Sequence, residues 1–452
     1  MRIRLTRPFS PNGYEAVLAS DTDWPWASAF SAASLAVRIS SGKLDEHYSA
    51  IVKVAAGVAA PLLADFVLWA LRRAAELRLD HLYFLARDGE QLLRVARLVA
   101  PIVGPPITMS YLQVSRLTLN LAASLEVSQE SLRWLLARIH RMSPSEFSDR
   151  LRLDEAGARR IFDSASIRVD DWNRPFGRTA GLAILSSLAD PRPASILADS
   201  AREIRSRTLP YLQQEGVFSD GSIGVVDVGG AGSQVWALNQ LRAELELPPV
   251  HGFFLARYRN ASLHQARPEY SEPTIDSYLF DEVTGDGIER YSSVMSLVDA
   301  FCAPSHGRVL DYDRVSSTWA PKFAPFDASA VSEWGLPTLV NTVERAVLVA
   351  TTLSRTHHPS QGVPKSVLSN LRRFVTRPTT SEARAWGSLP VSDMGARQLA
   401  TAISWRDLGR LASDSSPSPG VRHWWTGSRQ QSTLPVRITT RVGATLTRSR
   451  NR

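Results

Sequence analysis

The chain alternates between segments that predict buried strands and segments that predict helices, and this order limits its fold more than any other feature. The predicted strands lie, in chain order, in DHLYFLARDG, PPITMSYLQVSR, SIGVVDVGG and PPVHGFFLARYRN. An amphipathic helix that stops at Pro101 separates the first two, and a helix beginning near Ser233 separates the last two. Two strand–helix–strand units of this kind predict an α/β fold with a mostly parallel sheet and helices on both faces.

The rest of the chain is predicted to be largely helical, apart from its end. The predicted parts are an N-terminal extension at 1–44, an α/β domain at 45–320 with a helical insertion at about 119–216, a helical C-terminal region at 328–412 and a basic disordered tail at 413–452. The most apolar segment, 50–77, contains Lys53, Pro61 and Asp65. These residues interrupt it before about 18 apolar residues accumulate, so we expect a buried helix, or two helices broken at Pro61, rather than a membrane span.

Composition favours a cytoplasmic protein. The chain has 452 residues, of which 44% are hydrophobic, and Cys302 is its single cysteine, which rules out a disulfide within the chain. No signal peptide is evident at the start. The net charge is +8, and no acid follows Asp414, while seven arginines do. Such a tail is typically solvated, and it could also attach the protein to the anionic inner face of a membrane. No nucleic-acid recognition motif accompanies it, so we expect no nucleic acid as a partner.

Polar residues follow all four predicted strands. They are Arg87, Asp88 and Gly89 after the first, Ser115 and Arg116 after the second, Asp227 with its glycines in the third, and Arg257 with Tyr258 after the fourth. In parallel α/β sheets, ligands bind beyond the carboxyl ends of the strands. Three of these ends carry an arginine, and guanidinium groups pair well with phosphate, so the pattern predicts a site for an anionic ligand with several phosphates.

The stretch VVDVGGAGSQVW, residues 225–236, predicts a strand, an acid, a glycine-rich turn and a helix start. Glycines let a backbone approach a ligand closely, and a helix N-terminus offers free N–H groups and partial positive charge. Gly229, Gly230, Gly232 and Ser233 could therefore hold a phosphate. The same glycines could equally form a tight turn with no ligand.

Two other classes of protein have turns of this type, and a third class is considered because of a different motif; each lacks a second element here. A methyltransferase needs an acid at the end of the next strand, where this chain has Arg257 and Tyr258. A sugar-kinase-like ATPase needs a second strand–acid–glycine turn, which the first strand does not supply. A haloacid-dehalogenase-type phosphatase could use Asp311 and Asp313, but no later acidic motif completes a magnesium site.

Together, YFLARDGEQLL, YLQVSR and VVDVGGAGSQ resemble a domain of bacterial surface-polysaccharide gene clusters that is often fused to a haloacid-dehalogenase-type phosphatase. The resemblance covers roughly 45–312 and implies a phosphoribosyltransferase-like fold. It implies transfer of 5-phosphoribose from phosphoribosyl pyrophosphate (PRPP) to a glycan acceptor, expected to be lipid-linked, followed by dephosphorylation to ribofuranose. The phosphatase is absent from this chain, so a separate protein would supply that step.

The resemblance also implies roles for individual residues. Arg87 and Arg116 would hold the pyrophosphate, Asp88 would bind Mg²⁺ or orient its loop, and Asp227 would contact the ribose. The remaining positions carried over as substrate-binding are Gly89, Ser115, Gly229, Gly232, Ser233 and Gln234, and Gly230 joins them only through the glycine turn itself. The family often has a bulky aromatic residue where Gly230 stands, and phosphoribosyltransferases usually have an acid pair where Asp227 stands alone.

The acceptor site is expected in the segment 286–312, where Asp299 and His306 are candidates for gripping or deprotonating an acceptor hydroxyl. Either residue could instead be structural, Asp299 as an acid on a helix face and His306 as a loop residue. Two kinds of function remain open at this point. One is the transferase, and the other is a non-catalytic binding or scaffold protein that keeps a degenerate sheet.

Overall fold

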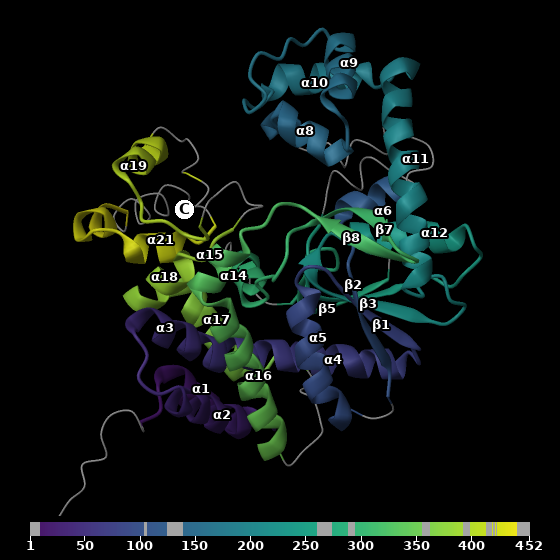
Figure 1. Cartoon of the computed structure of the whole chain (residues 1–452). Helices are drawn as coiled ribbons and strands as arrows, with labels where there is room; N and C mark the ends of the chain where they lie inside the picture. Colours follow the sequence, from purple (N-terminus) through teal and green to yellow (C-terminus); the bar gives the residue numbers. More distant parts are fainter. Residues whose placement is uncertain are drawn as a thin grey trace, which may run out of the picture.

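A computed structural model shows the α/β architecture, with helices covering both faces of one sheet (Figure 1). It describes residues 10–103, 106–123, 139–259, 274–287, 294–354, 362–391, 398–412, 418, 421 and 423–440. The α/β class expected from the strand–helix alternation is confirmed, and five of the six strands of the main sheet are parallel.

The main sheet has the strand order β2-β1-β3-β4-β5-β6. Its strands are β1 (His81–Leu85), β2 (Thr108–Leu112), β3 (Ile223–Gly230), β4 (His251–Arg257), β5 (Ile275–Asp281) and β6 (Asp286–Gly287). β6 is antiparallel to β5, and the other neighbours run parallel. After β1 the chain forms β2 on one side of β1, and it later forms β3 on the other side of β1. The order therefore reverses between β1 and β3, which is the place where doubly wound sheets bind ligands.

Alternation along the strands explains why both faces are covered. Leu82 and Phe84 of β1 belong to one buried cluster, while Tyr83 and Leu85 belong to another on the opposite face. The first face is packed by α4 (Ala60–Glu76) and α5 (Gly89–Val99). The second is packed by α6 (Arg116–Ala122), α12 (Ser233–Ala243) and the end of α11 (Pro191–Gln214).

The apolar segment forms one continuous helix, made of α3 (Glu46–Val54), a π-helical stretch η2 (Ala55–Ala59) and α4. The helix Glu46–Glu76 is long and apolar enough to cross a membrane, but 94% of its most apolar window is buried inside the protein. The expectation of a buried helix is confirmed, and the alternative of a break at Pro61 is wrong. The π-helical stretch lies directly before Pro61, and the Gly57 carbonyl oxygen, four residues before that proline, accepts from the Asn370 side-chain amide at 3.0 Å.

The N-terminal extension and the C-terminal region pack into one helical layer with α3 and α4. This layer contains α1 (Gly13–Ala19), α2 (Ala27–Ser40), α15 (Ala328–Trp334), α16 (Leu336–Leu353), α17 (Lys365–Thr376) and α18 (Thr380–Gly387). The Asn370 side-chain amide of α17 donates to the carbonyl oxygens of Tyr14 and Gly57, at 3.1 and 3.0 Å. One buried side chain thus ties together three segments that are remote in the sequence.

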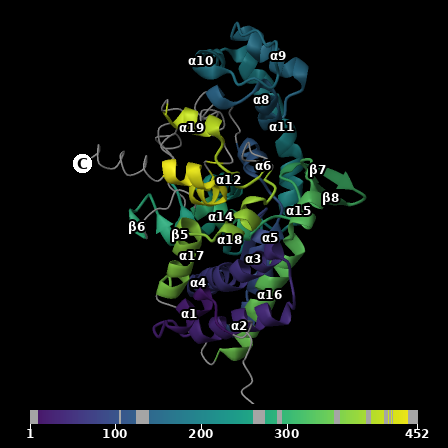
Figure 2. The ribbon, with the colours of Figure 1, turned by 90° about the vertical axis from the view of Figure 1, so that its left-hand side faces the viewer.

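The helical insertion forms a lobe beyond the sheet (Figures 1 and 2). Its described elements are η4 (Ile139–Arg141), α8 (Pro144–Leu151), α9 (Glu155–Ser164) and α10 (Gly177–Ser187), and they share a core with the first part of α11. Arg207 of α11 donates to both carboxylate oxygens of Asp311, at 2.8 and 2.7 Å. Asp311 lies in β7 (Val309–Val315), which forms a hairpin with β8 (Thr318–Phe323). Asp311 therefore holds α11 in place. This structural role supports the rejection of Asp311 and Asp313 as a phosphatase motif.

Part of the segment predicted to be a disordered tail is folded. Within it, α21 (Trp425–Gln431) follows the fully buried Trp424, whose indole N–H donates to the Val375 carbonyl oxygen at 3.0 Å. Residues 434–440 are also helical. The prediction of disorder is wrong for residues 423–440, because tryptophan burial outweighs the polar, basic composition on which it rested. The rest of that segment lies outside the described residues, apart from positions 418 and 421.

Candidate functional site

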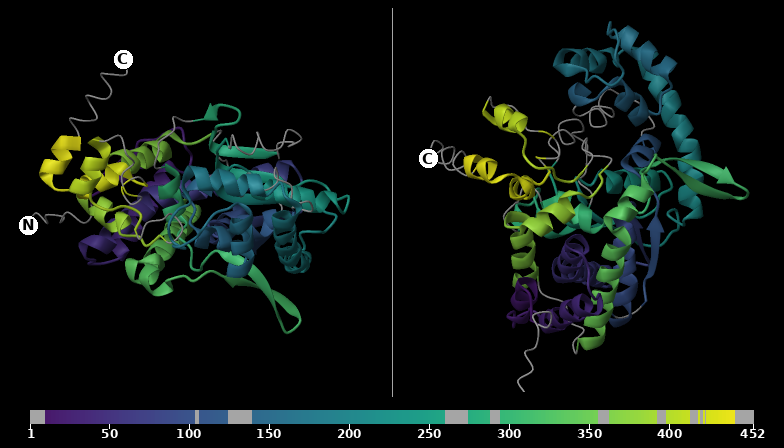
Figure 3. Two further views of the ribbon diagram at one scale, coloured as in Figure 1. Left: turned by 90° about the horizontal axis from the view of Figure 1, so that it is seen from above. Right: turned by 60° about the vertical axis from the view of Figure 1, so that its left-hand side comes forward.

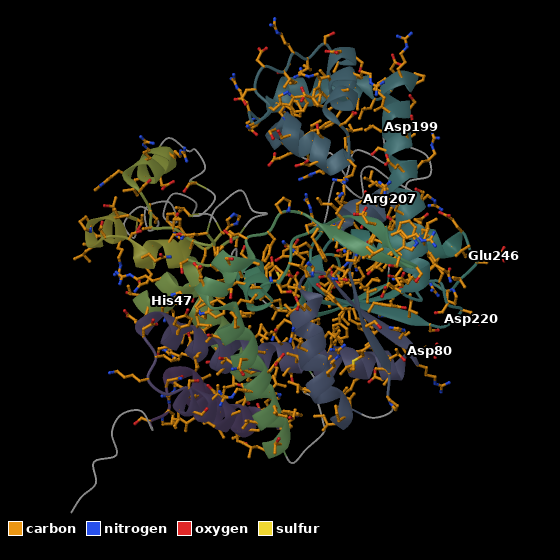
Figure 4. The ribbon with its side chains drawn as sticks, in the orientation of Figure 1. His47, Asp80, Asp199, Arg207, Asp220 and Glu246 are labelled. Atoms are coloured by element: carbon orange, nitrogen blue, oxygen red, sulfur yellow. The ribbon has the colours of Figure 1, made fainter. Side chains whose placement is uncertain are left out.

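The candidate site lies at the carboxyl edge of the sheet, where β1 and β3 are neighbours. Figure 4 shows Asp80, Asp220 and Glu246, which precede β1, β3 and β4, together on one side of the molecule. The carboxyl ends of the strands point away from that side. They carry Asp88, directly after β1, and Asp227, within β3. Polar residues from two strands that are distant in sequence therefore meet at the point where the strand order reverses.

Helix α14 (Val294–Phe301) closes this edge from the side. The methyl group of Met295 lies only 2.9 Å from the position that a Cβ on Gly229 would occupy. Asp299 is one helical turn beyond Met295, so both side chains project from the same face of α14 toward the end of β3. Cys302, 1% exposed, follows on that side three residues later.

Three carboxylates act on one another at this edge. Burial raises the pKa of Asp88 to about 6, against the lowering effect of Arg87 and Arg116. Burial, and then the negative charge of Asp88, raise the pKa of Asp227 to about 7, although Arg116 and the N–H groups of Gly229 and Val228 lower it. Burial and the same two carboxylates hold the pKa of Asp299 well above its ordinary value. The cluster therefore retains protons near neutral pH, and a bound cation would relieve its repulsion.

Two arginines balance the carboxylates. Arg87 and Arg116 lower the pKa of both Asp88 and Asp299, which places their guanidinium groups within electrostatic reach of the cluster. Arg116 begins α6 and is exposed, while Arg87 is partly buried beside Asp88. Positive charge at the exposed Arg116 therefore acts on the buried Asp227, whose pKa it lowers.

The Asp88 carboxylate does not cap the helix that follows it. Asp88 occupies the N-cap position of α5, yet within the described structure its side chain makes no capping hydrogen bond. By contrast, the Ser115 hydroxyl accepts the Thr118 N–H at 3.2 Å and so caps α6. The structure therefore gives Ser115, predicted to bind substrate, a structural role as a helix cap.

The glycine turn is shorter than expected. β3 continues through Gly230, so Ala231 and Gly232 alone connect it to α12. Gly232 is the N-cap residue with φ +80°, a conformation that favours glycine. Among the described residues, no side chain caps α12, so the N–H groups of Ser233 and Gln234 in its first turn have no side-chain acceptor there. A Cβ at Gly230 would meet nothing within 4 Å, so this part of the turn borders open space.

Two other glycines are required by packing. A Cβ on Gly89 would lie 2.5 Å from the carbonyl carbon of Phe84, and one on Gly229 would lie 2.4 Å from the carbonyl oxygen of Ala256. Both distances are shorter than any real contact of that kind. Gly89, predicted to bind substrate, thus lets α5 start directly against β1, and Gly229 lets β3 approach β4.

His306 lies beside the site, but its ring nitrogens already have partners. Nδ1 is 2.8 Å from the Gly307 carbonyl oxygen, which can only accept, so Nδ1 carries the hydrogen. Nε2 then accepts from the Tyr111 hydroxyl at 2.7 Å. Since that lone pair is occupied, His306 is poorly placed to deprotonate an acceptor. The next residue back, Ser305, donates to Glu90 of α5 at 2.6 Å, which fastens this loop to the helix that follows Arg87.

Arg257 also has a structural partner. It lies beside Gly230 in the sheet, but its guanidinium is 7% exposed and 3.7 Å from the Asp281 carboxylate. Asp281 in turn accepts the Val283 N–H at 2.7 Å, so the pair shapes the turn after β5. The basic end of β4, which argued against a methyltransferase, therefore also contributes little to a phosphate site.

The donor set fits a magnesium ion only in part. Within the described residues, no group of three or more His, Cys, Asp or Glu side chains is arranged to hold a metal ion. Carboxylates are nevertheless the ligands that Mg²⁺ prefers, and Mg²⁺ usually binds through one or two of them together with substrate phosphates. Asp88 and Asp227 meet that lesser requirement.

Sequence reasoning missed Tyr111, Glu90 and Cys302. Tyr111 belongs to β2 next to Phe84, and its hydroxyl lies 3.3 Å from the Arg87 carbonyl oxygen. Burial, together with Glu90 and Asp88, raises the pKa of Tyr111, so it stays a neutral phenol. Its place at the end of a strand that leads into Ser115 and Arg116 was the one available signal.

Comparison with models of known protein families and with curated proteins finds no match to this chain. The fold and the site define an α/β protein with a charged site at the reversal point of a doubly wound parallel sheet.

Proposed function

We propose that the protein is a PRPP-dependent phosphoribosyltransferase with a phosphoribosyltransferase-like fold, which moves 5-phosphoribose to a hydroxyl group of a glycan. The observation that carries the proposal is the meeting of Arg87, Arg116 and three carboxylates beside an uncapped helix N-terminus. PRPP has a matching distribution of groups, with a pyrophosphate, two ribose hydroxyls and a 5-phosphate. The resemblance of the three strand-end motifs to the polysaccharide family supports the same function.

Each part of the site has a role in this proposal. Arg87 and Arg116 pair with the pyrophosphate. Asp227 accepts hydrogen bonds from the ribose hydroxyls. The N–H groups of Ser233 and Gln234 hold the 5-phosphate, aided by the partial positive charge at the start of α12. Gly230 leaves room for that phosphate, since nothing lies within 4 Å of the place where its Cβ would be.

In the proposed reaction, the bond between the anomeric carbon and the pyrophosphate oxygen breaks, and the pyrophosphate leaves with the electron pair. The acceptor oxygen forms the new bond to that carbon and gives its proton to a carboxylate, for which we propose Asp299. The arginines stabilise the growing charge on the leaving group. Asp88 would hold Mg²⁺, which would neutralise part of the pyrophosphate charge. Arg116 and Arg87 favour the charged form of Asp299, which can accept the proton, and a cation at Asp88 would favour it further.

The acceptor in this proposal is a lipid-linked glycan at the inner face of the membrane, and a separate phosphatase removes the 5-phosphate afterwards. The second candidate function is a non-catalytic binding or scaffold protein, which the single acid at the glycine loop favours. Methyltransfer is a weaker alternative, because Arg257 and its partner Asp281 occupy the end of β4, where a cofactor ribose would need a free acid.

Titration calorimetry with PRPP and Mg²⁺ tests the proposal. We expect binding that Arg87→Ala and Asp227→Ala each weaken at least tenfold. Arg168→Ala is the matched control, because Arg168 is 90% exposed and pairs only with its neighbour Asp170 among the described residues. Absence of PRPP binding, or binding that neither site variant changes, would overturn the proposal. A rise in melting temperature with S-adenosylmethionine but not PRPP would favour methyltransfer.

A further inference from the structure

The C-terminal part of the chain forms a small unit with its own core. Ile403, Val421 and Val436 are buried together, with Leu408 and Trp425 packed against them. The unit consists of α19 (Trp405–Ala412), α21 and residues 434–440, and Trp424 anchors it to the main core through Val375. We call this unit the C-terminal unit.

The C-terminal unit exposes large apolar side chains. Trp405 is 71% exposed, Leu434 is 67% exposed and Ile438 is 56% exposed. Leu434 and Ile438 are four residues apart and share one face of the helix at 434–440, while Val436 and Thr440 are buried on the other. This helix therefore has two apolar faces, of which the protein core uses one. Leaving large apolar groups in water is unfavourable, which suggests that a partner covers the second.

The charge of the C-terminal unit is almost entirely positive. Its one acid among the described residues, Asp407, is 4% exposed and accepts hydrogen bonds from Ser404 and Ser418. Arg406 and Arg410 are exposed on α19, and Arg437 is partly exposed between Leu434 and Ile438. The sequence that follows adds Arg441, Arg448, Arg450 and Arg452 without any acid. The partner should therefore be apolar within and negatively charged at its surface.

The C-terminal unit lies on the side of the molecule toward which the strands' carboxyl ends point (Figures 1 and 3). α21 packs against α18, and α19 stands out beyond it. A partner that binds the C-terminal unit would therefore lie on the same side of the molecule as the candidate site.

We propose that the C-terminal unit docks on an anionic lipid bilayer. Trp405, Leu434 and Ile438 insert at the boundary between headgroups and acyl chains, where tryptophan is favoured. Arg406, Arg410 and Arg437 pair with lipid phosphates, and the basic residues that follow add to the attraction. A lipid bilayer matches both the exposed apolar side chains and the positive charge of the C-terminal unit, because it has phosphate groups at its surface and an apolar interior. If the proposed function holds, docking brings a lipid-linked acceptor to the same side as the transfer site.

Sedimentation of the full-length protein with lipid vesicles tests this inference. We expect binding to vesicles of phosphatidylcholine mixed with phosphatidylglycerol, and much weaker binding to phosphatidylcholine alone. The triple variant Trp405→Ser, Leu434→Ser, Ile438→Ser should lower the partition coefficient about tenfold or more. It should remain folded, because all three side chains are exposed. The matched control is Leu182→Ser, which replaces a leucine of α10 that is 57% exposed, and it should bind as the parent does.

Several results would overturn the inference. One is failure of the parent protein to bind anionic vesicles at low salt, and another is equal binding by parent and triple variant. A nucleic acid partner would need the arginines but not the apolar groups, so it would leave the triple variant unaffected. A second copy of the chain would appear as a dimer in light scattering that the triple variant abolishes. PRPP binding separates the two proposals: the triple variant should bind PRPP as the parent does, and each proposal can fail without the other.

Discussion

The Tyr111 hydroxyl donates a hydrogen bond to Nε2 of His306 across 195 residues of sequence, at 2.7 Å. The same hydroxyl is 3.3 Å from the Arg87 carbonyl oxygen. Together with the bond from Ser305 to Glu90, this contact holds the loop after α14 against the loop after β1. The contact thus connects the helix that carries Asp299 with the residues proposed to hold pyrophosphate.

We expect Tyr111→Phe to weaken the affinity for PRPP about three- to tenfold without unfolding the protein. The ring remains, but a hydrogen bond worth roughly 1 kcal/mol is lost, so that the Arg87 loop is held less firmly. Calorimetry measures the change. Tyr48→Phe is the control, because its hydroxyl donates to the Glu333 carbonyl oxygen at 3.1 Å on an exposed part of the helical layer. An equal loss in both variants would show that Tyr111 has no special connection with the site.

Asp227→Asn should stabilise the ligand-free protein, and more so as the pH rises. The folded pKa of about 7 lies above the ordinary value of 3.8, so folding loses stability as pH rises from about 4 and levels off above 7. The full difference corresponds to roughly 4 kcal/mol as an upper estimate. Melting temperatures of parent and variant should therefore diverge between pH 4 and 8.

The control for this measurement has the opposite sign. Burial raises the pKa of Asp407, but hydrogen bonds from Ser404 and Ser418 outweigh it and lower the pKa to about 2. Its charged form stabilises the fold above pH 4, and that stability is lost as the pH falls toward 2. Asp407→Asn should consequently lower the melting temperature at pH 7. If Asp227→Asn behaves like Asp407→Asn, burial and the charge of Asp88 do not disfavour the charged form of Asp227 as described.

Gly89→Ala should destabilise the protein by about 1–3 kcal/mol, because the added methyl group would meet the Phe84 backbone, which cannot move without distorting β1. Chemical denaturation measures the effect. Gly409→Ala in α19 provides the contrast, since nothing lies within 4 Å of its Cβ. There we expect a gain of up to about 1 kcal/mol from helix propensity. A neutral Gly89→Ala would mean that α5 can shift away from β1.

Arg116→Gln should weaken PRPP binding about tenfold, and Arg116→Lys should recover only part of it, because lysine keeps the charge but not the two-pronged geometry. The affinity of the parent should fall more steeply with added salt than that of Arg116→Gln. Arg202→Gln serves as the control, since Arg202 is 73% exposed and pairs with Asp199. An unchanged PRPP affinity of Arg116→Gln would show that Arg116 is not part of the proposed site.

Much of the sheet could be predicted from local pattern. The segments around Leu82, Val225 and Phe253 are short, apolar and bounded by polar turns, which is sufficient to identify strands. The folding of residues 423–440 could not be predicted in this way. Their composition resembles that of disordered chains, and the favourable term is burial of Trp424 against Val375, a contact between segments 49 residues apart.

The sequence by itself determined the α/β class, the four strands after which polar residues gather, and the meeting of Asp88 and Asp227. These follow from periodicity and from the rule that parallel strands share a carboxyl edge. Only the tertiary structure decided that Asp299 faces that edge. It also decided that Tyr111 is a hydrogen-bond partner of His306 and that Asp281 is the ion-pair partner of Arg257. Side chains from remote segments meet through packing and charge pairing, and neither leaves a local pattern in the chain.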